Sequence, residues 1–197
     1  MPLPYSGPRE ELHIRQIDMR GYRRPDGMFE IEGRVNDRKT YPLNLPTGRS
    51  IGPGDFIHDM WVRLVIDDNM VVQDAIAVSD SVPMASCKGA EPTLKNIVGL
   101  RIAAGWTNAV KRVLGGSRSC THLMELLIPL GTAAFQSLSP VRNARPDPLD
   151  AHGKPTKIGR CWSYDSGREG VMKRWPQFYT GPDAEEVRRK VIPLVAV

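Results

Sequence analysis

The first eighty residues alternate apolar and polar side chains, which is the period of a β-strand with one buried face. The alternation is clearest over residues 13–19 and 28–35, and Pro25, Asp26 and Gly27 lie between these runs. Proline, aspartate and glycine favour tight turns because each fixes or tolerates a backbone conformation that a turn requires. This part of the chain therefore predicts a β-hairpin.

A second pair of strands is expected after a loop at residues 42–54, which is rich in glycine and proline. Residues 57–66 form a largely apolar run, residues 67–69 have the composition of a turn, and residues 70–78 alternate again. Two consecutive hairpins of this kind predict an antiparallel sheet in the N-terminal half.

The apolar spacing then changes to intervals of three and four, which is typical of amphipathic helices. Residues 91–98 predict a helix that Gly99 ends, and a second helix is expected over residues 107–114. The longest amphipathic segment covers residues 120–138, and Pro129 should kink it because proline removes one backbone hydrogen bond.

Strands first and helices later predict an α+β fold, in which helices pack on one face of an antiparallel sheet of hairpins. We expect an extended arm over residues 1–10 and a single α+β domain over residues 11–139. Residues 140–197 are expected to form a loop and an aromatic C-terminal segment that packs on the domain.

The charge composition argues against a dedicated nucleic-acid partner. The chain has 27 Lys and Arg against 22 Asp and Glu, which gives a net charge of +5. A basic surface attracts phosphates. However, the densest basic stretch, residues 20–24, is short and has acidic neighbours, so the charge is mixed.

Membrane and secreted classes also fit poorly. No apolar run reaches the ~18 residues that a membrane span needs, and the N-terminal residues lack the pattern of a signal peptide. The three cysteines, Cys87, Cys120 and Cys161, are odd in number and far apart, which favours reduced thiols. We expect a soluble, cytoplasmic protein without a membrane partner.

The start of the long helix is the most informative local signal. A helix N-terminus offers free amide donors and the positive end of its dipole, which can lower the pKa of a cysteine there. Cys120 is thus a candidate nucleophile or metal ligand, or a small residue that closes a tight loop. His122 and Glu125 share a helix face, where Glu125 could orient the imidazole; the alternative is a capping histidine and a solvated glutamate.

Two further sets of residues could carry chemistry. His58 and Asp59 are neighbours in a predicted strand and so point to opposite faces, unless a bulge changes this. Arg20, Tyr22 and Arg23 place a phenol among guanidinium groups, which suits a carboxylate, phosphate or phenolate ligand. The alternative for this second set is a basic hairpin end.

The cysteines are candidate metal ligands. Cys87, Cys120 and His122, with Asp80, offer ligand types that zinc accepts, but no pair has the CxxC spacing of a structural site. We therefore predict no metal and no cofactor. The tryptophans Trp61, Trp106 and Trp162 are either core residues or the aromatic walls of a pocket.

Several segments together resemble a bacterial family of domains of unknown function: residues 19–27, 31–33, 57–61, 105–106 and 120–126. The similarity extends from about residue 10 to about residue 180. It implies phenylcoumaran gamma-formaldehyde lyase activity, in which a lignin-derived aromatic dimer releases formaldehyde and leaves a stilbene without a redox cofactor.

A second similarity concerns residues 60–125 alone, whose order of elements resembles the iron–sulfur cluster assembly scaffold fold. Those scaffolds carry a further cysteine early in the sheet, and this chain has none before Cys87. This similarity therefore implies the fold but not a cluster-binding site.

The lyase reaction implies three roles: a group that holds the phenolate, an acid at the ether oxygen and a base at the alcohol. Tyr22 with Arg20 or Arg23 suits the first role, and His58 or His122 could move protons near neutral pH. The full set of candidates is catalytic His58, His122, Tyr22, Asp59 and Glu125, and substrate-binding Arg20, Arg23, Trp61, Trp106 and Cys120.

The expected partner is a small aromatic substrate, and a homo-oligomer such as a homodimer is a further expectation. Two other functions stay open at this point. The chain could handle a metal or an iron–sulfur cluster, or it could be a non-catalytic ligand-binding module.

Overall fold

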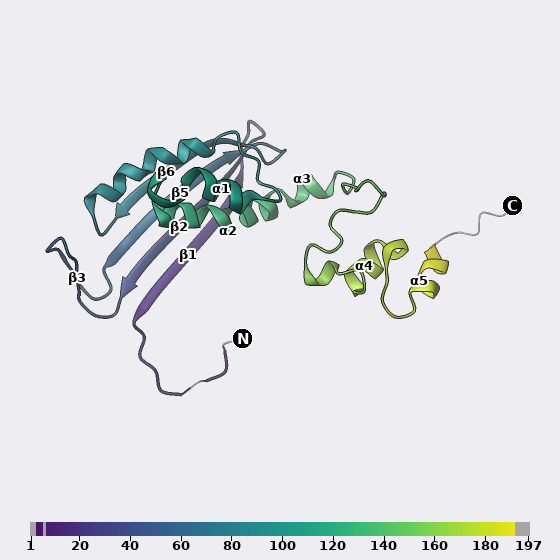
Figure 1. Cartoon of the computed structure of the whole chain (residues 1–197), viewed down its shortest axis with the longest axis horizontal. Coiled ribbons are helices and arrows are strands. Elements are labelled where there is room, and N and C mark those ends of the chain that lie inside the picture. The colour runs from purple at the N-terminus through teal and green to yellow at the C-terminus, as the bar shows by residue number, and fades with distance from the viewer. Residues whose placement is uncertain (1–2, 6, 192–197) are drawn as a thin grey trace. The chain divides into compact units, whose positions relative to one another are not determined.

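The computed structural model describes residues 3–5 and 7–191, and it divides the chain into two compact units, residues 1–141 and 142–197. The first unit has the predicted α+β fold (Figure 1). In the described part of the chain, no helix is both long and apolar enough to cross a bilayer.

The sheet of the first unit has four antiparallel strands in the order β1-β2-β5-β6. These strands are β1 (His13–Arg23), β2 (Phe29–Lys39), β5 (Phe56–Ile66) and β6 (Val72–Ser81). Both predicted hairpins are confirmed. The strands β1, β2 and β6 end three or four residues past the predicted bounds because the ladder continues into polar segments, whereas β5 differs from its prediction by one residue.

The predicted loop between the hairpins contains a small ladder of its own, formed by β3 (Leu43–Asn44) and β4 (Ser50–Ile51). Four helical segments follow the sheet: the 3-10 helix η1 (Ala85–Ile97), α1 (Trp106–Leu114), the short 3-10 helix η2 (Gly116–Arg118) and α2 (Thr121–Ser137). The sequence predicted only the second half of η1, since its first half lacks the apolar spacing of a helix.

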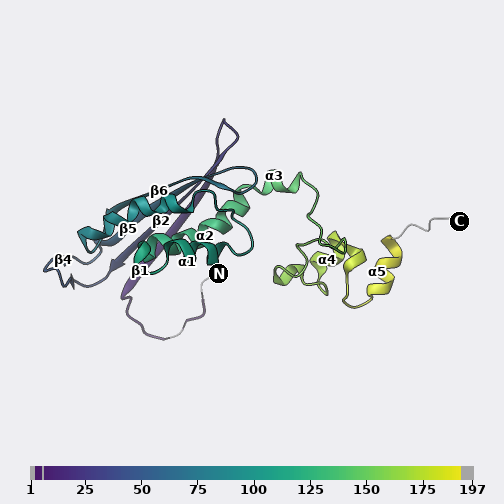
Figure 2. The ribbon, with the colours of Figure 1, turned by 45° about the horizontal axis from the view of Figure 1, so that its top comes forward.

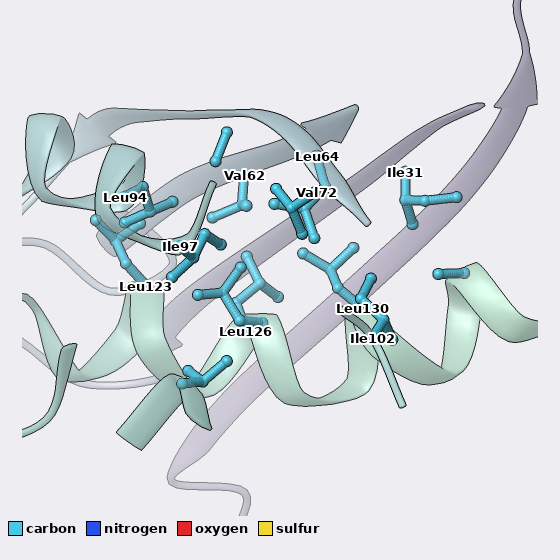
Figure 3. Packing of buried hydrophobic residues seen from close by; sticks show 14 of the residues in the cluster. Ile31, Val62, Leu64, Val72, Leu94, Ile97, Ile102, Leu123, Leu126 and Leu130 are labelled. Atoms are coloured by element: carbon cyan, nitrogen blue, oxygen red, sulfur yellow. The ribbon is translucent and has the colours of Figure 1, made fainter. Parts of the chain in front are cut away.

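The helices cover one face of the sheet, as the two views in Figures 1 and 2 show. Fully buried side chains of the strands meet those of α2 between the two layers (Figure 3), among them Ile31 and Leu64 from the sheet and Leu126 and Leu130 from the helix. Burial of this apolar surface is the main stabilising contribution to the layer.

Two glycines fix how closely α2 approaches its neighbours. A Cβ on Gly33 of β2 would lie 3.0 Å from the Leu130 side chain, and a Cβ on Gly131 would lie 2.8 Å from the Trp106 ring. The Trp106 indole N–H donates to the carbonyl of Leu127 at 2.9 Å. Trp106 is thus a core residue that ties α1 to α2.

The direction of α2 follows from its contacts with the sheet. His122 near its start lies by Asp37 at the end of β2, Leu130 lies over Gly33, and Ser137 at its end lies against Gly21 of β1. The helix therefore runs antiparallel to β2. This direction brings the first turn of the helix to the same end of the sheet as Asp37.

The helix α3 (Ser139–Asn143) spans the boundary between the units, and the second unit contains η3 (Trp162–Tyr164), α4 (Glu169–Arg174), η4 (Pro176–Phe178) and α5 (Ala184–Val191). These short segments are separated by turns, and the sequence analysis did not predict them.

Part of the aromatic C-terminal segment forms a small core of its own. Val171, Trp175 and Tyr179 are buried, and Tyr164 meets Trp175 edge to face with ring centroids 5.3 Å apart. Trp162 is 74% exposed. That this segment packs on the α+β domain stays a prediction.

Candidate functional site

A buried carboxylate lies at one end of the helix-covered face of the sheet. Asp37 of β2 is 2% exposed, and a charge in such a position needs partners. The guanidinium of Arg15 donates to both carboxylate oxygens, at 2.8 and 2.9 Å. On the other side, the Nδ1 atom of His58 lies 3.1 Å from Oδ2 and donates to it.

The strand register creates this row. Arg15 of β1 and His58 of β5 are the direct cross-strand partners of Asp37, and directly paired residues point to the same face. A β-bulge interrupts the β2–β5 pairing immediately after Asp37. His13 also approaches, with its Nε2 atom 3.1 Å from Oδ1.

A second imidazole comes from the first turn of α2. The rings of His122 and His58 lie 3.9 Å apart between centroids, with a tilt of 34°. The Nε2 atom of His122 is 4.0 Å from Asp37 Oδ2, and its Nδ1 atom is 3.9 Å from the Cys120 sulfur. The side chains of His58 and His122 are 15% and 26% exposed, so the pair is only partly shielded from solvent.

The surroundings of His58 favour its neutral form. Burial lowers the pKa of the imidazole, the nearby His122 lowers it further, and Asp37 opposes the change only in part. Because Nδ1 donates to Asp37, the lone pair of the neutral ring lies on Nε2. His58 therefore has the tautomer of a general base that is oriented by a carboxylate.

The two neighbouring acids have lowered pKa values. Burial raises the pKa of Asp37, but the hydrogen bonds and charge of Arg15, with the histidines, outweigh it. Burial likewise raises the pKa of the Cys120 thiol, and His122 together with backbone amides at the start of α2 reverses this. The predicted helix-terminus effect on Cys120 is consistent with this direction.

The same residues offer ligands for a metal ion. Asp37, His58 and His122 each present one ligand atom, and these atoms lie within 4.8 Å of one another. The ligand group found in the described part of the chain does not include Cys87 or Asp80, which the sequence suggested.

Four of the predicted site residues lie at this cluster. His58, His122 and Cys120 have the contacts given above, and Glu125 lies one turn further along α2. The Glu125 carboxylate is 4.0 Å from the Nη1 atom of Arg15. Glu125 thus pairs with the Arg15 guanidinium rather than with the His122 imidazole that it was predicted to orient.

Other predicted residues lie on the opposite face of the sheet. Asp59 accepts two hydrogen bonds from Arg34, at 2.7 and 2.6 Å, and the Arg34 guanidinium stacks 4.8 Å from the Trp61 ring centroid. His58 and Asp59 therefore point to opposite faces, as predicted. Arg20 also lies on this face, where it pairs with Asp18 at 3.1 Å.

This uncovered face contains a hollow of about 530 Å³. Its lining residues are Gln16, Ile17, Asp18, Arg20, Glu32, Arg34, Asn36 and Trp61. Arg20 and Trp61 were predicted to bind substrate, and the structure brings these two together. It separates them from the histidines by the thickness of the sheet.

The predicted cationic corner is also distant along the strand. Tyr22 and Arg23 lie seven and eight residues beyond Arg15 in β1, which corresponds to about 23 to 26 Å in an extended chain. The structure does not bring them to His58 and His122. Trp106 lies in the core of the first unit, and Trp162 belongs to the second unit.

The central residue of the cluster, Asp37, was missed by sequence reasoning. Residues 29, 31, 33 and 35 face the core, and Asp37 continues this alternation with a charge. A charged residue at a core-facing position of a predicted strand indicates a buried polar site, and this signal was present in the sequence. Its partners Arg15 and His13 follow only once the register of the hairpin is known.

Together, the fold and the cluster define a small α+β domain that carries a histidine–carboxylate centre at one end of its helix-covered face. The chain belongs to the family described as Protein of unknown function (DUF2889), whose model matches residues 13–136. The match covers nearly the whole α+β unit and every residue of the centre. No curated protein and no solved structure matches the chain significantly.

Proposed function

We propose that this protein is a lyase that uses general acid–base catalysis at Asp37, His58 and His122, and that its substrate is a lignin-derived phenylcoumaran. The reaction would release formaldehyde and leave a stilbene. The observation that carries the acid–base part is the pairing of His58 with the buried Asp37 beside a second imidazole. The substrate is suggested by the family resemblance of the sequence segments.

The reaction involves no change of oxidation state, and its protons balance: the para-phenol and the side-chain hydroxyl each lose one, and the ether oxygen and the regenerated phenolate each take one up. Ionisation of the para-phenol pushes electrons through the ring and breaks the bond to the ether oxygen, which gives a quinone methide. The ether oxygen takes up a proton. A base then removes the proton of the side-chain hydroxyl, the carbon–carbon bond breaks, formaldehyde leaves, and the ring regains its aromaticity.

The two histidines supply groups for these steps. Nε2 of neutral His58 is suited to accept the hydroxyl proton, while Asp37 stabilises the imidazolium that forms. His122, 3.9 Å away between ring centroids, is suited to donate the proton to the ether oxygen. Arg15 holds Asp37 ionised and supplies a positive charge near His58.

The direct test is to incubate the purified protein with dehydrodiconiferyl alcohol, which is a phenylcoumaran, and to measure stilbene absorbance and formaldehyde. We expect the two products in equal amounts. The His58→Gln and His122→Gln variants should each lose about 10²-fold or more in rate. His152→Gln is the control, since this exposed histidine belongs to the second unit.

Two outcomes would count against the proposal. Turnover that survives both histidine substitutions would show that the cluster does not catalyse the reaction. Binding of phenolic dimers without any turnover, in the wild type and in both variants, would favour the ligand-binding module.

A further inference from the structure

We infer that Asp37, His58 and His122 form a binding site for a late first-row divalent cation, with Zn²⁺ as the preferred ion. The inference rests on where the ligand atoms lie, on their chemistry and on the groups that hold them. It does not depend on the cysteines that the sequence suggested as ligands.

The ligand atoms come from three separate segments and converge. The histidine nitrogens and a carboxylate oxygen lie within 4.8 Å of one another. Zinc bonds of 2.0 to 2.2 Å place tetrahedral ligand atoms about 3.3 to 3.6 Å apart. The Asp37–His58 separation of 3.1 Å is already close to this value, and a rotation of the partly exposed His122 side chain would bring in the third ligand.

The donor set selects the class of ion. Two imidazole nitrogens and one carboxylate suit zinc and its neighbours, whereas Mg²⁺ and Ca²⁺ prefer sites made of oxygen ligands. Three protein ligands also leave one position of a tetrahedral ion open. That position would take water or a small anion.

The surrounding groups orient the carboxylate in advance. Arg15 bonds to both oxygens of Asp37 and His13 approaches Oδ1, while Oδ2 faces His58 and His122. Outer partners of this kind fix the orientation of metal ligands, and their loss typically costs about 10 to 100-fold in affinity.

Binding would change the tautomer of His58. A metal on Nδ1 replaces the proton that this atom shares with Asp37, so the ring proton moves to Nε2. An Nε2 atom that carries a proton is no longer a base. If the proposed lyase function is correct, on which this consequence rests, zinc at this site should inhibit turnover.

The test uses full-length protein that is purified without a polyhistidine tag and treated with a chelator. Co²⁺ titration followed by visible absorption, and Zn²⁺ titration followed by calorimetry, should each show one ion per chain. We expect the affinity to fall at least about tenfold in His58→Gln and in His122→Gln. Cys120→Ser and His152→Gln should bind as the wild type does.

The proposal is overturned if no stoichiometric binding is seen, or if both histidine variants bind as tightly as the wild type. Loss of binding in Cys120→Ser would point to a thiolate site and would also overturn it. Circular dichroism shows whether each variant is folded. His122→Gln keeps the test valid if His58→Gln fails to fold, since His122 is the more exposed of the two.

The lyase assay separates this inference from the proposed function. Turnover in the presence of a chelator, with inhibition by added Zn²⁺, supports both. Metal binding without turnover supports the site and removes the lyase, whereas turnover without metal binding removes the site alone.

Discussion

At the scale of single residues, the properties of His58 follow from three neighbours. Burial and the adjacent His122 lower the pKa of its imidazole, and the bond to Asp37 determines which nitrogen keeps the lone pair. An isolated histidine in water titrates near pH 6.5. The environment of His58 therefore extends the range of the neutral base below that value.

This sign gives a pH prediction for the proposed lyase. The active form of the base is neutral, so kcat/KM should rise with pH along an acid limb that lies below the ordinary titration value of histidine. In Asp37→Asn the carboxylate that opposes the lowering is lost, so the pKa of His58 falls further. The acid limb should then move to lower pH.

The same variant should also be slower at its pH optimum, by about 10²-fold or more, because an amide does not stabilise the imidazolium as the carboxylate does. A pH–rate profile of the wild type and Asp37→Asn measures both effects. An acid limb that stays in place, or that moves to higher pH, would contradict the assignment of His58 as the base.

At the scale of elements, the position of the cluster depends on how α2 lies on the sheet. Gly33 and Gly131 allow the helix to approach β2 and Trp106 closely, and the resulting direction places His122 by Asp37. The long amphipathic segment was predicted almost to the residue. Pro129 lies within α2, and the helix continues past it.

A substitution in this contact tests the packing. Gly131→Ala should favour the helix by about 1 kcal/mol on propensity alone. However, its Cβ would lie 2.8 Å from the buried Trp106 ring, which its bond to Leu127 holds in place. We expect a net loss of about 1 to 3 kcal/mol in the free energy of unfolding.

Urea denaturation measures this change, and Thr132→Ala on the exposed side of the same turn is the matched control. A stabilised Gly131→Ala variant would mean that Trp106 can move and that the close contact does not fix α2. The control should change stability by no more than about 0.5 kcal/mol.

At the scale of the whole molecule, the two units have separate cores. The larger core combines the sheet with the helices, and the smaller one gathers residues around Val171 and Trp175. The histidine cluster lies entirely within the first unit. The homo-oligomer that the sequence analysis expected stays a prediction, as does packing of the second unit on the first.

We expect a fragment of residues 1–143, which keeps α3 whole, to fold on its own. It should unfold cooperatively with a thermal midpoint within about 4 °C of that of the first transition in the full chain. Circular dichroism on both proteins measures this. A fragment that is unfolded, or whose midpoint is far lower, would show that the C-terminal segment stabilises the domain.

The sequence by itself determined the four long strands and the main helices of the first unit, because hydrophobic period and turn residues are local properties. The alternating runs identified both hairpins, the spacing of three and four identified α1 and α2, and the order of the two gave the α+β class. It also identified His58 and His122 as candidate catalytic residues and Cys120 as a candidate substrate-binding residue.

Only the tertiary structure decided which of these residues meet. Strand register made Asp37 the partner of both Arg15 and His58, and the direction of α2 added His122. The same register put Asp59 and Trp61 on the other face. Register and helix direction depend on contacts between segments far apart in the chain, so local patterns of hydrophobicity do not contain them.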